Sequence, residues 1–364
     1  MACRILYVVG QLGAGGLERQ LYLLLQSMDR ERYWPELVVW NYRENEMYVE
    51  PLRDLRIPLH GFRTCDSRYA KLRMLRKLVS DKRPQVIHSY TFYTNFAARW
   101  AAWGRKTVAV GSVRSDFDND KRVCGTVLGN LSARWPRVQI YNNSAGAEKA
   151  RRSHSPFVPK KVFVVRNSLD LQQFRKLPLR PNGVARILGI GSLLKLKRWD
   201  RLLRAASALK VRGLEFQLEI AGGGPLRESL EQQARDLDVA DRVRFRGHTE
   251  DIQSLLADST FLAHPSDLEG CPNVVMEAMA CGRAVVATEV GDIPFLVEDG
   301  KTGFIVDRQN NSELVDRLAT LIGNRNLCRE MGEAARIKAE GGFGLERLVS
   351  ETFAAYRSAG WKEL

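Results

Sequence analysis

The sequence predicts an α/β fold made of two Rossmann-like halves, each a doubly wound parallel sheet. The chain of 364 residues is longer than one typical core, which favours two domains of ordinary size. Short apolar runs rich in Val and Ile alternate with helical patterns along the chain, as expected for βα units. The alternation restarts after KLPLRPNG at 176–183, whose prolines and basic residues are typical of an interdomain linker.

We therefore expect an N-terminal domain over 1–170 and a second domain over 171–343. A last segment, 344–364, holds a helix that we expect to cross back to the first domain. Each βα junction brings glycines and polar residues to one edge of its sheet, so two sheets that face each other would line a central cleft.

The first half opens with a strand at 5–10, a glycine-rich turn and a helix, LERQLYLLLQSM. Gly13, Gly15 and Gly16 do not spell the dinucleotide fingerprint. They still allow backbone amides at a helix N-terminus to approach a phosphate closely. A tight turn without a ligand is the alternative.

Four further strands are expected in this half, at 36–40, 84–90, 107–114 and 138–144, and KVFVVRNSLDLQQF at 161–174 ends it. The strand at 84–90 delivers His88, Ser89 and Tyr90 to the carboxyl edge of the sheet, where ligands bind. Arg114 reaches the same edge, to meet a phosphate or to pair with the acids that follow. A lone His is usually structural, which is the alternative for His88.

The segment from Arg63 to Arg83 carries eight basic residues against two acidic ones around a helical pattern. This predicts a basic amphipathic helix over 68–83. It either packs on one face and is solvated on the other, or adsorbs to anionic lipid. In the second case the residues in contact with lipid would be Arg68, Lys71, Arg73, Arg76 and Lys77.

We expect no metal site. Asp116, Asp118 and Asp120 resemble a calcium loop, but Lys121 and Val127 stand where that loop needs Gly and Glu, so a polar loop is expected. The six cysteines show no CxxC spacing, which favours reduced, structural thiols and excludes a zinc site.

The second half repeats strand, turn and helix from Arg186, with Lys195, Lys197 and Arg198 in the first turn, where a phosphate would fit. The next strands end at the glycines of AGGGP, 221–225, and at Gly247-His248. The stretch from His264 to Val306 then contains Glu269 and Glu277, eight residues apart. If Glu269 lies at the entrance of a helix, Glu277 falls on nearly the same face two turns later. The pair would hold two ends of one polar ligand, or both would be solvated surface charges.

Composition limits the kinds of partner and the cellular location that we expect for this protein. No apolar run approaches the length of a membrane span, and the N-terminus suits a buried first strand better than a signal peptide, so a cytoplasmic protein is expected. The net charge of +14 favours phosphate-rich partners. Nucleic acid is disfavoured, because only Tyr69 interrupts the basic helix with an aromatic ring.

With these motifs in view, the sequence resembles the retaining glycosyltransferases of family four, which have the GT-B fold. The resemblance covers nearly the whole chain and rests on the following segments: GGLE at 15–18, NNS at 142–144, NSLDLQQF at 167–174, GSLLKLKRWDRLL at 191–203, AGGGP at 221–225 and EGCPNVVMEAMACGRAVVAT at 269–288.

The resemblance implies transfer of a sugar from a nucleotide sugar, with a UDP- or GDP-sugar as co-substrate and no required cofactor or metal. It places Glu269 on the sugar hydroxyls, Glu277 on the ribose, Lys197 on the diphosphate and His248 near the base. The other residues that it assigns to the donor are Gly15, Gly16, Gly222, Gly224, Gly270, Cys271, Asn273 and Val274.

Three departures from the family pattern concern the phosphates and the acceptor. Ser192 stands where the family often has Arg, so Lys195 or Arg198 would share the diphosphate charge. The family's H-x-H reads His88-Ser89-Tyr90, and Arg114 replaces a common His. We assign the reaction to Glu269, Lys197, His88, Tyr90 and Arg114, and either His88 or Tyr90 would lie beside the transferred sugar.

The acceptor expected from the resemblance is lipid-linked, a lipopolysaccharide or an exopolysaccharide, reached at the inner face of the membrane. Another GT-B enzyme, such as an epimerase or a phosphorylase, is the near alternative. A non-catalytic protein that binds membrane or nucleic acid is the remote one.

Overall fold

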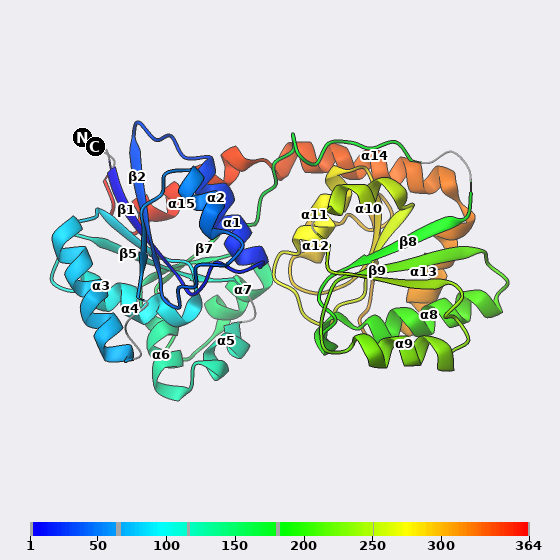
Figure 1. The fold of residues 1–364 in the computed structure, drawn as a ribbon, viewed down its shortest axis with the longest axis horizontal. Helices are drawn as coiled ribbons and strands as arrows, with labels where there is room; N and C mark the ends of the chain where they lie inside the picture. The colour runs from blue at the N-terminus through cyan, green and yellow to red at the C-terminus, as the bar shows by residue number, and fades with distance from the viewer. Residues whose placement is uncertain (1–2, 63–66, 115–116, 180–182, 250, 363–364) are drawn as a thin grey trace. The chain divides into compact units, whose positions relative to one another are not determined.

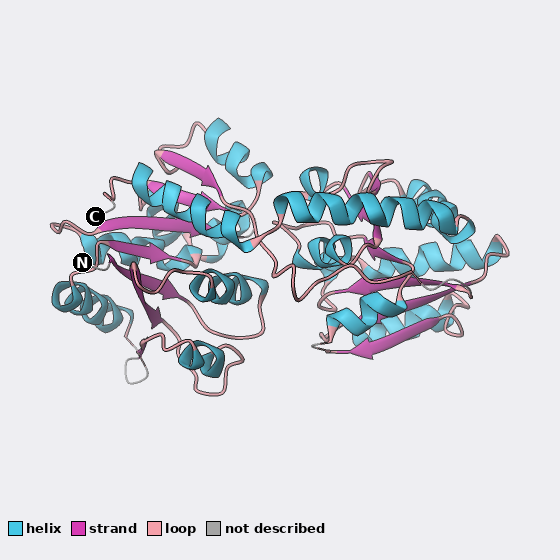
Figure 2. Cartoon of the chain, turned by 90° about the horizontal axis from the view of Figure 1, so that it is seen from above, coloured by secondary structure: helices cyan, strands magenta, loops and turns pink. Residues whose placement is uncertain are grey.

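The computed structural model describes the chain except for residues 1–2, 63–66, 115–116, 180–182, 250 and 363–364 (Figure 1). It divides into two compact units, one formed by Met1–Ser168 with Leu345–Leu364 and the other by Leu169–Gly344. Each unit is a parallel sheet with helices on both faces (Figures 1 and 2). Cys65 and Asp116 lie outside the described residues.

The sheet of the first unit has the strand order β3-β2-β1-β4-β5-β6-β7. The order reverses between β1 and β4, where Val8 lies opposite Ser89. The strands are β1 (Cys3–Val9), β2 (Tyr33–Val39), β3 (Leu59–Gly61), β4 (Val86–Ser89), β5 (Val108–Val113), β6 (Val138–Tyr141) and β7 (Lys161–Val164).

The helices of this unit are α1 (Gly16–Gln26), α2 (Val49–Asp54), α3 (Arg68–Lys82), η1 (Phe92–Thr94), α4 (Asn95–Ala102), α5 (Phe117–Val123), α6 (Thr126–Arg134), α7 (Ser144–Arg152) and α15 (Leu345–Ser358). Although α15 comes from the end of the chain, it packs on the first sheet. The ring of Phe353 lies 4.3 Å from that of Tyr33 in β2. The first unit is therefore completed only by the last twenty residues.

The second unit has the strand order β10-β9-β8-β11-β12-β13, which reverses between β8 and β11. Its strands are β8 (Ala185–Ile190), β9 (Phe216–Ala221), β10 (Val243–Gly247), β11 (Phe261–His264), β12 (Ala284–Thr288) and β13 (Gly303–Val306). Its helices are η2 (Lys195–Lys197), α8 (Trp199–Val211), α9 (Arg227–Asp236), α10 (Ile252–Asp258), α11 (Asn273–Ala280), α12 (Ile293–Leu296), α13 (Asn311–Gly323) and α14 (Arg325–Gly342).

The central strands are buried on both faces because helices cover both. In β11, Phe261 and Ala263 join the apolar cluster on one side of the sheet, while Leu262 joins the cluster on the other. This alternation is the period of two that a strand imposes on its side chains. It explains why the strands read in the sequence as continuous apolar runs.

Two local predictions are wrong, and one strand was not predicted. The polar loop expected around Asp118 is helix α5, whose Phe117 is buried and whose acids lie in the first turn, where the helix dipole favours them. Of the expected linker at 176–183, residues 180–182 lie outside the described residues, and Leu177 packs on the second unit instead, because the Arg283 guanidinium donates to its carbonyl oxygen at 2.9 Å. Strand β3 was missed, since three residues are too few to show a period.

The described cysteines, Cys3, Cys124, Cys271, Cys281 and Cys328, form no disulfide. Within the described residues, no helix combines the length and the apolar character that a membrane span needs.

Candidate active site

The second unit brings two loops together at the point where its strand order reverses. The turn after β8 contains Lys197 in η2, and the loop after β11 contains Glu269. The backbone N–H of Asp267 donates to the carbonyl oxygen of Leu196 at 2.8 Å, which joins the loops. Ligands of open α/β sheets bind at such a switch point.

Glu269 is the centre of this site. Its Oε1 accepts from the Lys197 Nζ at 2.6 Å and lies 2.8 Å from the His264 Nε2. Burial alone would raise the pKa of this carboxyl, but the charges and hydrogen bonds of His264 and Lys197 outweigh it and lower the pKa to about 2. With only 10% of its side chain exposed, Glu269 is a buried carboxylate that stays ionised at neutral pH.

A second group of charges fixes the loop that carries Glu269. Asp267 accepts from Arg198 at 2.8 Å and from the buried Arg201 at 3.0 Å. Arg198 also donates to Asp200, and hydrogen bonds to these two carboxylates raise the pKa of its guanidinium. Arg198 therefore ties η2 to the loop through two carboxylates.

The remaining predicted residues of this turn are at the surface. The side chains of Ser192 and Lys195 are exposed. The carbonyl oxygen of Ser192 accepts from the Trp199 indole at 3.0 Å, which anchors the turn on α8. Lys195 is an exposed cation of the same turn as Lys197.

Gly222 and Gly224 allow the loop after β9 to lie directly on the turn after β8. Gly222 has φ +152°, and a Cβ there would lie 1.9 Å from the Gly191 carbonyl oxygen. Gly224 has φ +154°, and its Cβ would lie 2.7 Å from the backbone of Leu193. Only glycine fits such contacts. The two glycines thus hold the shape of the site, and no side chain separates the loops.

His248 is exposed beside the same loop. A Cβ on Gly223 would lie 3.9 Å from the Cβ of His248. This places the imidazole next to the glycine turn, at the end of β10.

Helix α11 carries the other predicted donor residues. Asn273 and Val274 are half-buried in its first turn, Cys271 is buried just before it, and Glu277 is 1% exposed. The Gly270 carbonyl accepts from the backbone N–H of Asp292 at 2.9 Å, which ties the helix entrance to the connection after β12. Neither glutamate of the pair is therefore a solvated surface charge.

In the first unit, His88 is fully buried and hydrogen-bonded at both ring nitrogens. Nδ1 lies 2.8 Å from the Tyr356 hydroxyl of α15, and Nε2 lies 2.8 Å from the Ser112 hydroxyl. Burial first, and then the charge of Arg114, lower the pKa of His88 well below its usual value, so the ring is neutral. Both ring nitrogens are thus engaged within the first unit, which agrees with the structural alternative for His88.

Tyr90 and Arg114 lie beside His88 at the ends of β4 and β5. The guanidinium carbon of Arg114 is 4.0 Å from the centre of the buried Tyr90 ring. The acids that follow Arg114 in the sequence are not its partners among the described residues. Stacking on the ring is the interaction that holds its position.

Gly15 and Gly16 lie at the start of α1, after β1. Gly15 is the N-cap, and its backbone N–H donates to the Gly13 carbonyl at 2.8 Å. A Cβ on Gly15 would lie 2.1 Å from the Glu18 carboxylate. The tight turn expected from the sequence is present, with an acidic side chain against it.

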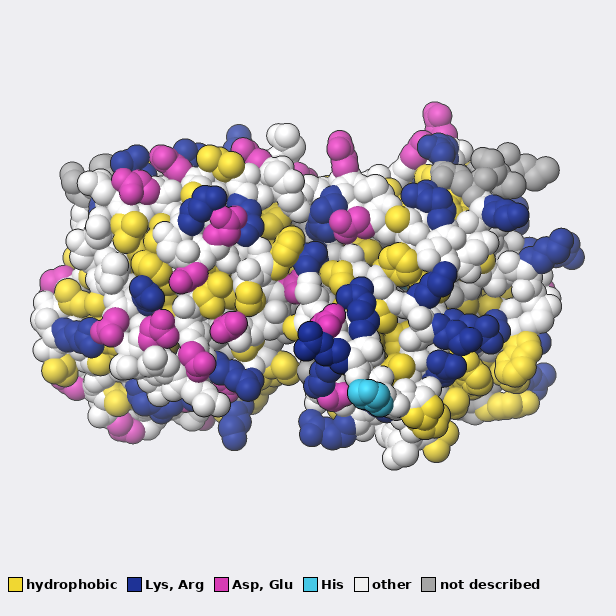
Figure 3. All heavy atoms as spheres, turned by 180° about the vertical axis from the view of Figure 1, so that it is seen from behind, with side chains coloured by type: hydrophobic (Ala, Val, Ile, Leu, Met, Phe, Trp, Pro, Cys, Tyr) yellow, Lys and Arg dark blue, Asp and Glu magenta, His cyan; other side chains and the backbone are white. Residues whose placement is uncertain are grey.

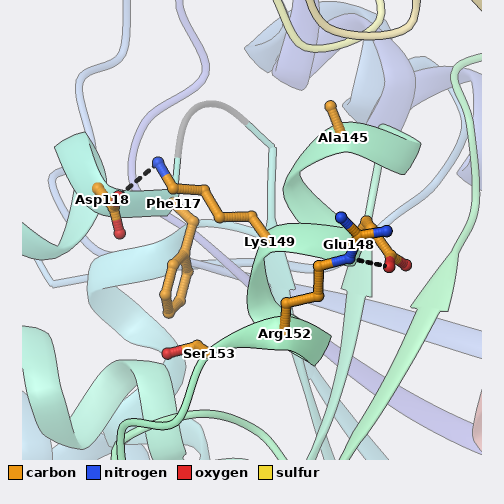
Figure 4. Close-up of a pocket in the computed structure, with 7 residues that line it drawn as sticks. All are labelled: Phe117, Asp118, Ala145, Glu148, Lys149, Arg152 and Ser153. Carbon is orange, nitrogen blue, oxygen red and sulfur yellow. Dashed lines mark hydrogen bonds and ion pairs between the residues drawn. The ribbon is translucent and has the colours of Figure 1, made fainter.

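A pocket of about 590 Å³ opens between α5 and α7 of the same unit (Figure 4). Lys149 pairs with Asp118 across it, and the Arg152 Nε donates to Glu148 at 2.7 Å. Because its charges pair with one another, the pocket does not require a charged ligand. The described residues that line it are Phe117, Asp118, Ala145, Glu148, Lys149, Arg152 and Ser153.

Several residues that shape the sites were missed from the sequence. No sequence pattern predicted the roles of His264 and Tyr356. His264 contacts Glu269 across a loop, and Tyr356 contacts His88, which is distant in the sequence. Gly291 was visible only as one more glycine, yet with φ +54° it lies so close to the Glu269 carbonyl oxygen that a Cβ would be 2.4 Å from it.

Comparison with known proteins gives the family. The sequence profile described as glycosyl transferases group 1 matches residues 172–338, and that of the glycosyl transferase 4-like domain matches residues 15–168. Each profile thus falls within one of the two structural units. The chain belongs to the family-four-like glycosyltransferases with the GT-B fold.

Two curated relatives agree with this membership. An uncharacterized glycosyltransferase of Haemophilus influenzae is 34% identical over 45% of this chain and 47% of its own length. The D-inositol 3-phosphate glycosyltransferase of Streptomyces scabiei is 32% identical over 66% of this chain and 58% of its own length. The chain thus spans about half the length of the curated relatives it matches.

The GT-B fold is also found in solved structures. The Anabaena protein Alr3699/HepE in complex with UDP superposes with a TM-score of 0.83 at 19% identity, over 98% of this chain and 100% of that one. The lipopolysaccharide outer core galactosyltransferase WaaB superposes with a TM-score of 0.78 at 16% identity, over 98% and 99%. Both likenesses extend over the two units of this family-four-like chain.

Proposed function

We propose that this protein transfers a sugar from a nucleotide sugar to a glycan or lipid-linked acceptor, with retention of the anomeric configuration. The observation that carries the proposal is the ionised, buried Glu269 held by Lys197 and His264 at the switch point of the second sheet. A carboxylate in this state is a strong acceptor for sugar hydroxyls. The profile matches and the relatives' names support the same class of reaction.

In the proposed reaction the bond between the anomeric carbon and the diphosphate breaks, and a bond to an acceptor oxygen forms. The acceptor's proton passes to the departing diphosphate. Lys197 stabilises the negative charge that develops on this leaving group, Glu269 and Glu277 bind the sugar and the ribose, and the first turn of α11 supplies backbone N–H groups. We propose no metal or other cofactor.

A UDP-sugar is the first donor to test, because similar structures were solved with UDP and with UDP and glucose. Melting temperatures measured with UDP-, GDP- and ADP-sugars identify the donor, since a ligand at 100 times its Kd stabilises the fold by about 2.7 kcal/mol. Lys197→Ala should abolish most of the shift. Lys301→Ala removes a lysine paired with Glu298 on the surface of the same unit and should leave the shift unchanged.

The same donor panel separates the near alternatives. Slow hydrolysis or transfer supports the proposed reaction. An epimerised donor without any transfer would refute it and indicate an epimerase, and a requirement for free phosphate would indicate a phosphorylase.

We propose the inner face of a membrane as the place of reaction, through helix α3. Two of the five basic residues expected there are engaged elsewhere: Lys71 donates to the Trp40 carbonyl at 2.7 Å, and Arg76 to the Trp100 carbonyl at 2.8 Å. The exposed cations of the helix are Arg68, Arg73 and Lys77. Lys and Arg side chains are also spread over the face drawn in Figure 3, with Asp and Glu among them.

A further inference from the structure

The guanidinium group of Arg114 is buried and has no counter-ion in the described chain. Each of its three guanidinium nitrogens is shielded from solvent and has no hydrogen-bond partner there. The side chain lies on the Tyr90 ring, 4.0 Å from the ring centre. The arginines around Glu269 differ, because Arg198 and Arg201 both donate to Asp267.

The surroundings of Arg114 do not compensate its charge. His88 and Tyr90 are buried, and their shifted pKa values keep both neutral at pH 7. The Tyr90 hydroxyl also lacks a partner in the described chain. An arginine stays protonated in proteins, and an unpaired buried charge costs several kcal/mol. A site that keeps such a charge is suited to an anion.

The position of Arg114 agrees with a ligand site. It follows β5 directly, and the Asn142 amide donates to its carbonyl oxygen at 3.1 Å, which fixes the backbone. Tyr90 follows β4, one of the two strands between which the order of the first sheet reverses. The carboxyl ends of these strands form the ligand-binding edge of a doubly wound sheet.

We propose that Arg114 anchors an oxyanion subsite in the first unit, which binds the phosphate or carboxylate group of an acidic acceptor. A guanidinium stacked on a ring keeps its N–H edge for two parallel hydrogen bonds to one oxyanion, and the Tyr90 hydroxyl supplies another donor. The assignment to an acceptor rests on the proposed function. The anion site itself does not.

The test compares Arg114→Gln with the wild-type full chain, using inorganic phosphate and glycerol phosphate as probes in thermal shift and calorimetric titration. We expect the variant to bind both at least about tenfold more weakly, since hydrogen bonds to a charged group are lost. The variant should also melt at or above the wild-type temperature without ligand, because it removes an uncompensated charge. A purely structural arginine would give a lower melting temperature and unchanged phosphate binding, and either result would overturn the proposal.

Two control variants separate this site from others. Arg76→Gln removes an arginine that also stacks on a ring, 5.2 Å from the centre of Trp100, but that donates to a carbonyl; it should melt lower and keep the phosphate response. Lys197→Ala should lose UDP binding and keep the response that depends on Arg114. If Lys197→Ala instead abolishes all phosphate binding, the response belongs to the donor site and the proposal fails.

The two probes also identify the source of the anion. Tighter binding of glycerol phosphate assigns the subsite to a phosphorylated acceptor, and tighter binding of inorganic phosphate assigns it to a free ion. A phosphate response that depends on Arg114, without any response to nucleotide sugars, would retain the anion site and refute the proposed function. UDP-sugar binding without a phosphate response that depends on Arg114 would retain the proposed function and refute the anion site.

Discussion

The ionisation of Glu269 depends on two neighbours from different elements, Lys197 in η2 and His264 in β11. Neither contact is made within a single helix. Both therefore exist only once the second sheet is formed. The stability of the second unit therefore depends in part on whether Glu269 is ionised and paired. A ligand that binds Glu269 has to replace part of this network with its own hydroxyls.

Replacing Glu269 with Gln should lower transfer about a hundredfold, since the charged acceptor for the sugar hydroxyls is lost. The variant should also change the pH dependence of stability. The folded-state pKa of about 2 is below the ordinary value of 4.5, so the carboxylate stabilises the fold above pH 4.5 and loses this effect as the pH falls toward 2.

Urea denaturation at several pH values measures this effect. Between pH 6 and 3.5 the wild type should lose about 1 kcal/mol more than Glu269→Gln. If the free energy of unfolding depended on pH in the same way for both proteins, the network would not hold the carboxyl ionised.

Individual site residues differ in how well the sequence alone predicted them. Glu269 and Lys197 were predicted because motif spacing places them at βα junctions, which topology then brings together. Arg198 and His88 were assigned to ligands because residue type alone does not reveal a partner. Their partners, Asp267 and Tyr356, come from another loop and from the far end of the chain, and only the tertiary fold brings them into contact.

At the scale of elements, the donor site depends on how closely the loops after β8 and β9 approach each other. Gly222→Ala should destabilise the second unit by at least about 2 kcal/mol, because φ +152° is unfavourable for alanine and the new methyl group meets the Gly191 carbonyl. The variant should also weaken donor binding, since the turn that holds Lys197 has to shift.

Gly213→Ala is the matched control for this substitution. Gly213 has φ +73°, but a Cβ there meets nothing within 4 Å, so the cost should stay near 1 kcal/mol with donor affinity unchanged. Chemical denaturation and titration with UDP give both quantities. Equal effects of the two substitutions would mean that the loop contact does not shape the site.

Helix α3 offers a second test at this scale. The double substitution Arg73→Glu and Lys77→Glu changes the charge by four and leaves Lys71 and Arg76 on their carbonyl partners. It should weaken binding to vesicles that contain anionic lipid, by about 1 kcal/mol per basic residue removed from the surface. Vesicle sedimentation at low and high salt measures the effect.

The control for the vesicle experiment is Arg244→Glu with Arg308→Glu, which makes the same change of charge at exposed positions of the second unit. An equal loss of binding in both variants would show that net charge, and not helix α3, attracts the protein to the membrane.

At the scale of the whole molecule, the two units differ in how the chain builds them. The second unit is one continuous segment, whereas the first is closed by α15 after the chain has passed through the second. Helix α15 supplies Phe353 and Tyr356 to the core of the first unit. The Tyr356 hydroxyl also donates to that of Tyr7 at 3.0 Å while it contacts His88.

This connectivity predicts different behaviour of the two segments when they are produced alone. Residues 169–344 should unfold cooperatively and retain UDP binding, because their core and the Glu269 network are complete. Residues 1–168 should lack a cooperative transition, since β1 and β2 would expose the surface that α15 covers and His88 would lose a buried hydrogen-bond partner, at a cost of about 1–3 kcal/mol. Circular dichroism melts test both, and adding residues 345–364 to the first segment through a flexible linker should restore its transition. A cooperative melt of 1–168 alone would show that the fold of the first unit does not depend on the helix that completes it.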